Sequence, residues 1–398
     1  MGFADWVRDH AGALDDLEPL RRAVGGARVV ALGENSHFIR EFAEVRHDLV
    51  RFLVRECGFT AYATEFGFSE GFEVDAWLGG AGPDDAWDGR PEIPWGVGES
   101  LWWLREHNRV TGGRVRFAGI DVPAAGGSAL PALDPLVEYV RVADPEVVPL
   151  VEVAREIAGR FGAASMALAA PAWARLGVAE QDALSAVLGR LLVRFRAVEP
   201  LHVQRVGRAA FDVAVHRLVG AVSVDHTVRA VAELYSGCGL PADMSAREVY
   251  LADSVRWHVD RGERVVVAAH NAHVQRVPVS HGGVASVVPM GQHLAAALGG
   301  EYFAVGFTSV GGETADTRWD DAAPFGFRVC PARLAAPEPG SLEEAFVGLG
   351  PVVVDLRGSP EGPVKFRMHG GYQRVVPRGA FDAVVSVPVS TVADDTGY

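Results

Sequence analysis

The sequence predicts an α/β protein with a largely parallel central sheet that helices cover on both faces. Short β-branched runs ending in small or polar residues alternate along the chain with stretches of helical periodicity. Most of these runs are apolar throughout, as is typical of strands that are buried on both faces. The expected strands span residues 28–33, 60–65, 114–120, 264–270, 302–307, 352–355 and 383–389.

Helical periodicity fills several intervals between these strands. Residues 40–57 place apolar side chains on one stripe and charged residues, Arg46 among them, on the other faces, which predicts a surface helix packed on the core. Residues 98–110 and 245–260 are also expected to be helical. Because strand and helix alternate, we expect layers of helices on both sides of the sheet.

The alternation stops between residues 131 and 240, where Ala, Leu, Val and Arg recur at helical spacing. We expect an all-helical insertion here, between the third and fourth strands. It would form a cap on an α/β catalytic core made of residues 1–130 and 241–398. Residues 311–339 are rich in Gly, Pro, Ala and Asp, which predicts an irregular loop that could serve as a lid.

Composition and charge narrow the function of this 398-residue chain. Its formal charge is −14, from 51 acidic and 37 basic residues, and it lacks the basic patch that nucleic-acid binding requires. It shows neither an apolar stretch of the ~20 residues that span a bilayer nor a signal peptide. Its three widely spaced cysteines favour a reducing, cytoplasmic location. We expect a small-molecule partner, and the composition does not predict the oligomeric state.

Polar side chains, all but one of them titratable, stand directly after four of the expected strands. Since the carboxyl ends of parallel strands meet at one edge of a sheet, we expect these side chains to share one site. Carboxylates repel one another, so their clustering favours a functional role. The residues are Glu34 and His37 after the first strand, Glu65 after the second, Asp121 after the third, and His270, Asn271 and His273 after the fourth.

A histidine flanked by carboxylates can activate water as a general base, because the carboxylate fixes its tautomer and raises its pKa. The His270-x-x-His273 pair could alternatively hold a divalent metal together with one of the two glutamates. Its spacing is not the His-Glu-x-x-His of zinc enzymes, however. We therefore expect a site without a cofactor or metal.

A competing motif lies at residues 67–71. Their sequence, Gly-Phe-Ser-Glu-Gly, matches the G-x-S-x-G pattern of a nucleophile elbow and stands between a strand and a helical stretch. Only two expected strands precede Ser69, whereas the elbow of an α/β-hydrolase follows several. We favour the interpretation that Ser69 is the N-cap of a helix over residues 70–78.

The same chain resembles the erythromycin esterase family. Gly33-Glu34-Asn35-Ser36-His37, with Arg40-Glu41-Phe42 after it, is similar to the first motif of that family, although Asn35 stands where many members have glycine. Similar segments follow in order at residues 60–65, 93–95, 117–121, 269–273, 290–294 and 306–308. The resemblance implies hydrolysis of macrolide lactones, with His37 as the base that activates water and Glu34, Glu65, His270 and Arg40 as its companions.

The leading hypothesis is an ester hydrolase that works without a covalent intermediate. His37, oriented by Glu34 or Glu65, would deprotonate water, and the hydroxide would attack an ester or lactone carbonyl. His270 and Arg40 would stabilise the oxyanion, and His270 or His273 would protonate the leaving alkoxide. The residues expected to contact substrate are His273, Asp121, Asn271 and Trp95, which lies in the loop before residue 98.

Two alternatives keep the same residues and give them other roles. One is a lyase, cyclase or isomerase that tailors a natural product by proton transfer. The other is a protein that binds a small molecule or a metal without turning it over. Incorporation of oxygen-18 from labelled water into the product separates hydrolysis from proton transfer, and recovery of an unchanged ligand with saturable affinity would favour binding.

Overall fold

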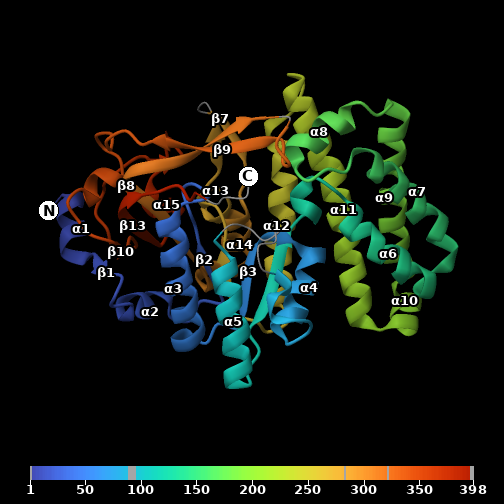
Figure 1. Cartoon of the computed structure of the whole chain (residues 1–398), viewed down its shortest axis with the longest axis horizontal. Coiled ribbons are helices and arrows are strands. Elements are labelled where there is room, and N and C mark those ends of the chain that lie inside the picture. The colour runs from blue at the N-terminus through green and yellow to red at the C-terminus, as the bar shows by residue number, and fades with distance from the viewer. Residues whose placement is uncertain (1, 88–95, 282–283, 321, 395–398) are drawn as a thin grey trace.

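A nine-stranded sheet forms the centre of the computed structural model, which describes residues 2–87, 96–281, 284–320 and 322–394 (Figure 1). Its strands lie in the order β1-β10-β13-β8-β2-β5-β3-β4, and β9 pairs with β8. The strands are β1 (Gly12–Ala13), β2 (Val29–Leu32), β3 (Ala61–Gly67), β4 (Arg116–Asp121), β5 (Val265–Ala268), β8 (Tyr302–Trp319), β9 (Phe327–Arg333), β10 (Val352–Asp355) and β13 (Ala383–Ser390). The predicted α/β class is confirmed.

The central strands run parallel to one another. Each of the five neighbouring pairs from β13 to β4 is parallel, whereas β10 and β1 are antiparallel to their neighbours at one edge. Strands β2 and β5 are buried along their whole length, which explains why their sequences are apolar throughout. Their carboxyl ends, together with those of β3 and β4, open toward one side of the sheet.

Helices cover both faces of the sheet, because alternate side chains of each strand enter different apolar clusters. In β2, Val30 and Leu32 face one cluster, while Val29 and Ala31 face the other. The first face is covered by α2 (Glu18–Val24), α3 (Arg40–Cys57), α4 (Phe68–Leu78) and α5 (Gly98–Thr111). The second is covered by α1 (Phe3–His10), α12 (Ser245–Val259), α14 (Met290–Leu298) and the short α13 (Asn271–Val274) and α15 (Pro377–Ala380).

Six helices lie in the chain between β4 and α12 and gather beside the sheet, on the right in Figure 1. They surround a third apolar cluster, to which the core contributes Phe68 of α4 and Tyr250 of α12. The helices are α6 (Leu130–Ala143), α7 (Val148–Phe161), α8 (Met166–Ala174), α9 (Val178–Ala197), α10 (Glu199–Val206) and α11 (Arg208–Tyr235). None of the helices in the described residues is both long and apolar enough to cross a membrane.

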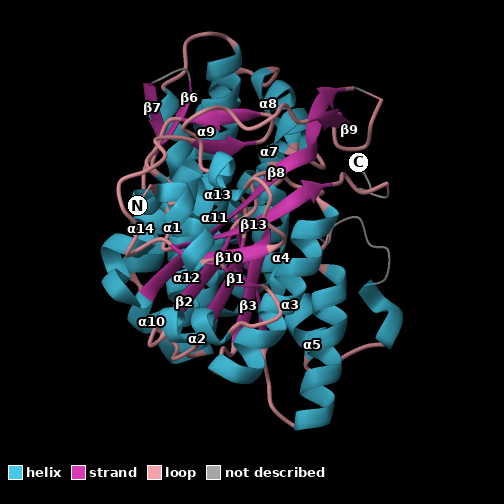
Figure 2. Cartoon of the chain, turned by 90° about the vertical axis from the view of Figure 1, so that its left-hand side faces the viewer, coloured by secondary structure: helices cyan, strands magenta, loops and turns pink. Residues whose placement is uncertain are grey.

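The expectation of an irregular loop over residues 311–339 is wrong for most of that range. Strand β8 continues to Trp319 and pairs antiparallel with β9, from Glu313 opposite Arg333 to Trp319 opposite Phe327. Figure 2 shows this β8–β9 hairpin projecting beyond the sheet. Cross-strand pairing here overrides the low strand propensity of glycine, alanine and aspartate. Two further small hairpins are β6 (Val279–His281) with β7 (Val284–Val287) and β11 (Phe366–Met368) with β12 (Gly371–Gln373).

Candidate active site

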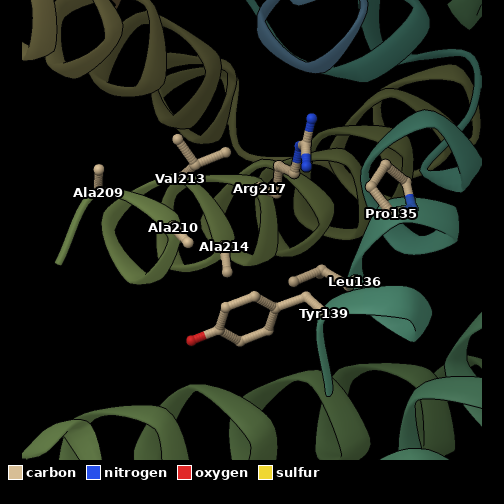
Figure 3. A pocket seen from close by; sticks show the side chains of 8 residues that line it. All are labelled: Pro135, Leu136, Tyr139, Ala209, Ala210, Val213, Ala214 and Arg217. Atoms are coloured by element: carbon tan, nitrogen blue, oxygen red, sulfur yellow. The ribbon is translucent and has the colours of Figure 1, made fainter. Parts of the chain in front are cut away.

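Four of the predicted site residues line one pocket at the carboxyl ends of the central strands. The pocket has a volume of about 840 Å³, and the residues are Glu34, His37, Glu65 and Asp121. Its apolar walls include Met166 from the helical segment and the aromatic side chains of Phe325 and Phe327 from the β8–β9 hairpin. A second cavity of about 340 Å³ lies between α6 and α11 (Figure 3). The residues that line it include none of the predicted site residues.

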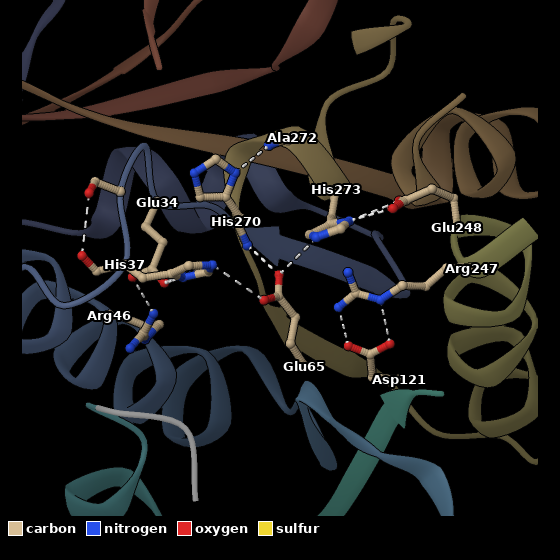
Figure 4. Close-up of polar contacts among 11 residues, drawn as sticks. Glu34, His37, Arg46, Glu65, Asp121, Arg247, Glu248, His270, Ala272 and His273 are labelled. Carbon is tan, nitrogen blue, oxygen red and sulfur yellow. Dashed lines mark hydrogen bonds and ion pairs between the residues drawn. The ribbon is translucent and has the colours of Figure 1, made fainter. Parts of the chain in front are cut away.

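His37 and Glu34 are in direct hydrogen-bond contact at the end of β2 (Figure 4). His37 Nδ1 lies 2.7 Å from Glu34 Oε1, while Arg46 donates from Nη1 to Glu34 Oε2 at 2.8 Å. The His37 side chain is 41% exposed and faces the pocket. Burial lowers the pKa of His37, but the hydrogen bond and charge of Glu34 outweigh this, so the pKa lies above its ordinary value.

Glu65 lies between the histidines. Its Oε1 accepts the backbone N–H of His270 at 2.6 Å and lies 3.7 Å from His273 Nε2. Its Oε2 lies 3.8 Å from His37 Nε2. Burial raises the pKa of Glu65, but the charges of His273 and His37 outweigh it and lower the pKa. The site therefore holds an ionised carboxylate on the pocket side of the His37 ring.

His273 is not among the described residues that line the pocket, and it pairs with Glu248 of α12, whose Oε1 lies 2.7 Å from Nδ1. Burial lowers the pKa of His273, but Glu248 and Glu65 outweigh it and raise the pKa to about 9. His273 is therefore a half-buried cation at neutral pH, beside Glu65. Its expected role in contacting substrate is not supported by this position.

Asp121 forms a two-pronged ion pair with Arg247. Arg247 donates from Nε to Asp121 Oδ1 at 2.8 Å and from Nη2 to Oδ2 at 2.5 Å, and both residues line the pocket. Neither Arg247 nor Glu248 was singled out from the sequence. Both lie in the first turn of α12, the predicted helix over residues 245–260, and the helical pattern did not show that this end faces the site.

His270 lies behind His37. It is the N-cap of α13, where its Nδ1 accepts the Ala272 N–H at 3.2 Å. Its ring lies between those of His37 and His369, with ring centroids 5.0 and 4.7 Å apart. Burial and the neighbouring histidines hold the pKa of His270 well below its ordinary value. His270 is thus a neutral side chain outside the pocket wall formed by the described residues, which does not favour contact with an oxyanion.

Arg40 is not where the sequence predicted. It begins α3, is 51% exposed and lies 3.5 Å from Asp394. Arg46 takes the predicted place of a guanidinium beside Glu34, because it lies four residues after Phe42, on the buried stripe of the helix. The assignment of Arg46 to a surface face is therefore wrong.

Asn271 and Trp95 are the other two residues that were expected to contact substrate. Asn271 is buried, and both polar ends of its amide bind the backbone of Phe307, through Nδ2 to O at 2.8 Å and N to Oδ1 at 3.1 Å. It joins the end of β5 to β8, so its side chain is not available to a substrate. Trp95 lies outside the described residues.

Ser69 is neither an N-cap nor a paired nucleophile. Helix α4 begins at Phe68 with Gly67 as its N-cap, which places Ser69 in the first turn. Its hydroxyl is buried and has no hydrogen-bond partner in the described part of the chain. Glu70 instead reaches across to accept the Ala124 N–H at 2.6 Å. A serine without a histidine partner does not form a nucleophile elbow.

The proposed metal ligands do not converge. Among the described residues, no group of three or more His, Cys, Asp or Glu side chains is arranged to hold a metal ion. His270 Nδ1 already accepts a backbone N–H, and His273 is held as a cation by Glu248, whereas a metal ligand must be a neutral imidazole. These residues therefore fit hydrogen-bonding roles rather than metal ligation.

A mixed α/β fold that gathers a histidine and ionised carboxylates at the ends of its central strands can carry out acid–base chemistry on a bound substrate. The sequence pattern of the erythromycin esterase family matches residues 54–389. The chain is 36% identical to erythromycin esterase type II of Escherichia coli, over 99% of each. The chain belongs to the erythromycin esterase family and is an ester-bond hydrolase.

Further relatives agree with this membership. Erythromycin esterase type I of Escherichia coli is 28% identical over 94% of this chain and 93% of that protein. Among solved structures, a mutant of the erythromycin esterase EreC in its open conformation superimposes with a TM-score of 0.88 at 26% identity, covering 96% of each chain. A succinoglycan biosynthesis protein shares the fold alone, with a TM-score of 0.75 at 18% identity over 98% of this chain and 96% of that one.

Proposed function

We propose that this protein hydrolyses the lactone of a macrolide with a water molecule that His37 activates. The observation that carries the proposal is the contact of 2.7 Å between His37 Nδ1 and Glu34 Oε1. This contact fixes the tautomer with hydrogen on Nδ1, so the Nε2 lone pair faces the pocket and Glu65. The names of the relatives support a macrolide as the substrate class.

In this mechanism His37 Nε2 takes a proton from water as the hydroxide attacks the lactone carbonyl. Glu34 and Glu65 stabilise the imidazolium that forms, because both are ionised and close to the ring. When the tetrahedral intermediate collapses, the bond to the ring oxygen breaks and the imidazolium returns its proton to the leaving alkoxide. No bond to the protein forms at any stage.

The size of the pocket supports a large substrate. Its volume of about 840 Å³ lies near the upper end of the roughly 300–1,000 Å³ usual for ligand sites. Phe38, Phe66 and Val97 give its walls an apolar surface that suits a macrocycle, in addition to the aromatic residues of the hairpin. The polar groups lie together at the strand ends, where the lactone would be cleaved.

The test compares His37→Ala with Ser69→Ala on erythromycin and related macrolides. We expect His37→Ala to lose turnover by about 100-fold or more, because the general base is removed. Ser69→Ala should keep turnover near that of the wild type, since its hydroxyl does not reach the pocket. Mass spectrometry in oxygen-18 water should show one labelled oxygen in the product. The opposite pattern in the two variants, or an unlabelled product, would refute the proposal.

A further inference from the structure

The mechanism leaves one requirement unmet, a donor for the oxyanion. We propose that Arg247 binds the carbonyl oxygen of the substrate, stabilises the oxyanion, and then holds the carboxylate of the product. This inference rests on the proposed function. It assigns to Arg247 the stabilisation of the oxyanion, which was expected of Arg40 and His270 from the sequence. Asp121 is the positioning residue that fixes the guanidinium.

The contacts of Arg247 leave one nitrogen facing the site. Nε and Nη2 are bound to Asp121, which is fully buried, while the Arg247 side chain is 25% exposed and lines the pocket. Within the described residues Nη1 has no hydrogen-bond partner. In Figure 4 it points away from Asp121, toward the side where Glu65 and His273 lie. A bidentate pair of this kind holds the guanidinium plane in a fixed orientation.

The charge balance of the pocket also favours Arg247. The described lining contains the carboxylates of Glu34, Glu65, Glu70 and Asp121 and the guanidinium groups of Arg46 and Arg247. An oxyanion that forms beside Glu65 is repelled by that carboxylate unless a cation is in contact with it. Arg46 is only 4% exposed and is bound to Glu34. The Nε of Arg46 is also without a partner in the described residues, but it is buried, whereas the Arg247 side chain is 25% exposed, so Arg247 is the more accessible donor.

The step is balanced without any further reactant. As the hydroxide oxygen bonds to carbon, the carbonyl π electrons move onto oxygen, which accepts a hydrogen bond from Nη1 of Arg247. Collapse restores the C=O bond and breaks the bond to the ring oxygen. The acid that results loses its proton to solvent, and its carboxylate pairs with Arg247. A fixed donor of this kind contributes to the rate because it needs no reorientation as the charge develops.

The experiment measures kcat and KM for Arg247→Gln, Arg247→Lys and Asp121→Asn. We expect Arg247→Gln to lower kcat about 100-fold or more, with KM within about threefold of the wild type, because the lost contact is strongest in the transition state. Arg247→Lys keeps the charge but loses the fixed orientation. Its kcat should therefore lie between that of the wild type and that of Arg247→Gln. Arg256→Gln, on the same helix but 47% exposed and paired with Asp253, is the matched control and should leave kcat unchanged.

Two further readouts separate catalysis from support of the fold. A low, non-denaturing concentration of guanidinium should partly restore kcat to Arg247→Ala, as a merely structural loss would not allow. The ring-opened acid should inhibit the wild type more strongly than Arg247→Gln, by about tenfold. Thermal melting of each variant checks folding. If Arg247→Gln does not fold, kcat and KM of Arg247→Lys decide whether the guanidinium at position 247 acts in catalysis.

The inference is overturned if Arg247→Gln keeps kcat, or if it changes only KM. Failure of the proposed function looks different, since in that case His37→Ala would retain turnover whatever Arg247 does. An inactive His37→Ala together with a fully active Arg247→Gln would leave the general base in place and remove Arg247 from the mechanism.

Discussion

The histidines that follow β2 and β5 carry different charges because their neighbours differ. His37 contacts one carboxylate directly, which raises its pKa, and its ring faces the pocket. His270 lies between two other imidazole rings, and burial together with these neighbours lowers its pKa and keeps it neutral. His273 is enclosed by Glu248 and Glu65, which keep it charged. Three residues of one type thus provide a base, a neutral support and a fixed cation.

The raised pKa of His37 predicts the pH dependence of turnover. The base form accumulates only as pH rises above the ordinary value of about 6.5, so kcat/KM should increase with pH through a midpoint above that value. Glu34→Gln removes the charge that raises the pKa, so the midpoint should move to lower pH and the plateau of kcat should fall by about tenfold or more. A pH–rate profile of both proteins checks this. Glu44→Gln, an exposed position on α3, is the control, and an unmoved midpoint in Glu34→Gln would contradict the prediction.

His273 predicts a pH dependence of stability. Its folded-state pKa of about 9 lies above the unfolded value, so the stabilisation from its ion pairs is complete below about pH 6.5 and is lost as pH rises through about 9. The advantage of the wild type over His273→Asn in free energy of unfolding should shrink across this window, by about 3 kcal/mol at most. Urea unfolding at the two ends of the window measures the change. A constant difference would show that His273 is neutral in the folded protein.

The sequence predicted which side chains stand at the strand ends, because a strand fixes where its last residue emerges. It missed Arg46, Arg247 and Glu248, all of which reach the site from helices. Arg247 binds a carboxylate 126 positions earlier in the chain, and the periodicity of α12 does not show which partner its first turn faces. Arg40 was chosen for its nearness in sequence to His37, whereas helix geometry turns Arg46 toward Glu34 instead.

At the scale of elements, the β8–β9 hairpin connects the segment that carries His37 to the helices beside the sheet. Ser36 Oγ accepts hydrogen bonds from the Thr314 hydroxyl and the Ala315 N–H, each at 3.1 Å. At the other end of the hairpin, Ser165 donates to the Phe325 carbonyl at 2.7 Å. Hydrogen bonds therefore hold the hairpin at both of its ends, and the hairpin lines the pocket between them.

Loss of the hydrogen bond between Ser165 and the Phe325 carbonyl should weaken substrate binding. Ser165→Ala deletes the hydrogen bond to Phe325, at a cost of about 1 kcal/mol, together with the long N-cap contact of 3.4 Å to the Leu168 N–H of α8, and leaves the groups at the strand ends in place. We expect KM to rise about fivefold and kcat to stay near the wild-type value. Steady-state kinetics check this, with Ser236→Ala as the control, since that exposed hydroxyl binds only the Glu233 carbonyl. An unchanged KM would show that the hairpin keeps its position without this bond.

The β8–β9 hairpin is also the element that the sequence pattern did not predict. Residues 311–319 contain Gly311, Gly312 and three threonine or alanine positions, which have no apolar alternation, so their pattern resembles a loop. Their strand conformation comes from pairing with residues 327–333, which propensity does not register. The helices at 40–57, 98–110 and 245–260 were predicted within one residue of their ends because their apolar stripes pack directly on the sheet.

At the scale of the whole molecule, Phe68 joins the core to the helical segment. It is buried, belongs to the cluster that α6–α11 surround, and lies 4.2 Å from the His216 ring of α11 and 5.5 Å from the Trp257 ring of α12. Through such residues the helical segment shares its apolar core with two helices of the sheet domain. We therefore expect the two parts to unfold together in the wild type.

Calorimetry tests this coupling. The wild type should melt in a single transition, whereas Phe68→Ala should lose about 3–5 kcal/mol and melt in two steps, because the cavity lies where the parts meet. Leu191→Ala, a buried position inside the helical segment, is the comparison, and it should lower the stability without dividing the transition. Two transitions in the wild type would show that the helical segment is independently stable.

The position of β5 in the sheet has a consequence for biosynthesis. It lies between β2 and β3, yet β4 ends at Asp121 and β5 begins only at Val265. A ribosome adding about 5–20 residues per second needs roughly 7–30 s to cover that interval. Until then the nascent β2 and β3 lack the strand that separates them, and their unpaired edges are open to aggregation. The yield of active enzyme in a foreign host should therefore rise when synthesis is cooled or chaperones that bind such edges are supplied.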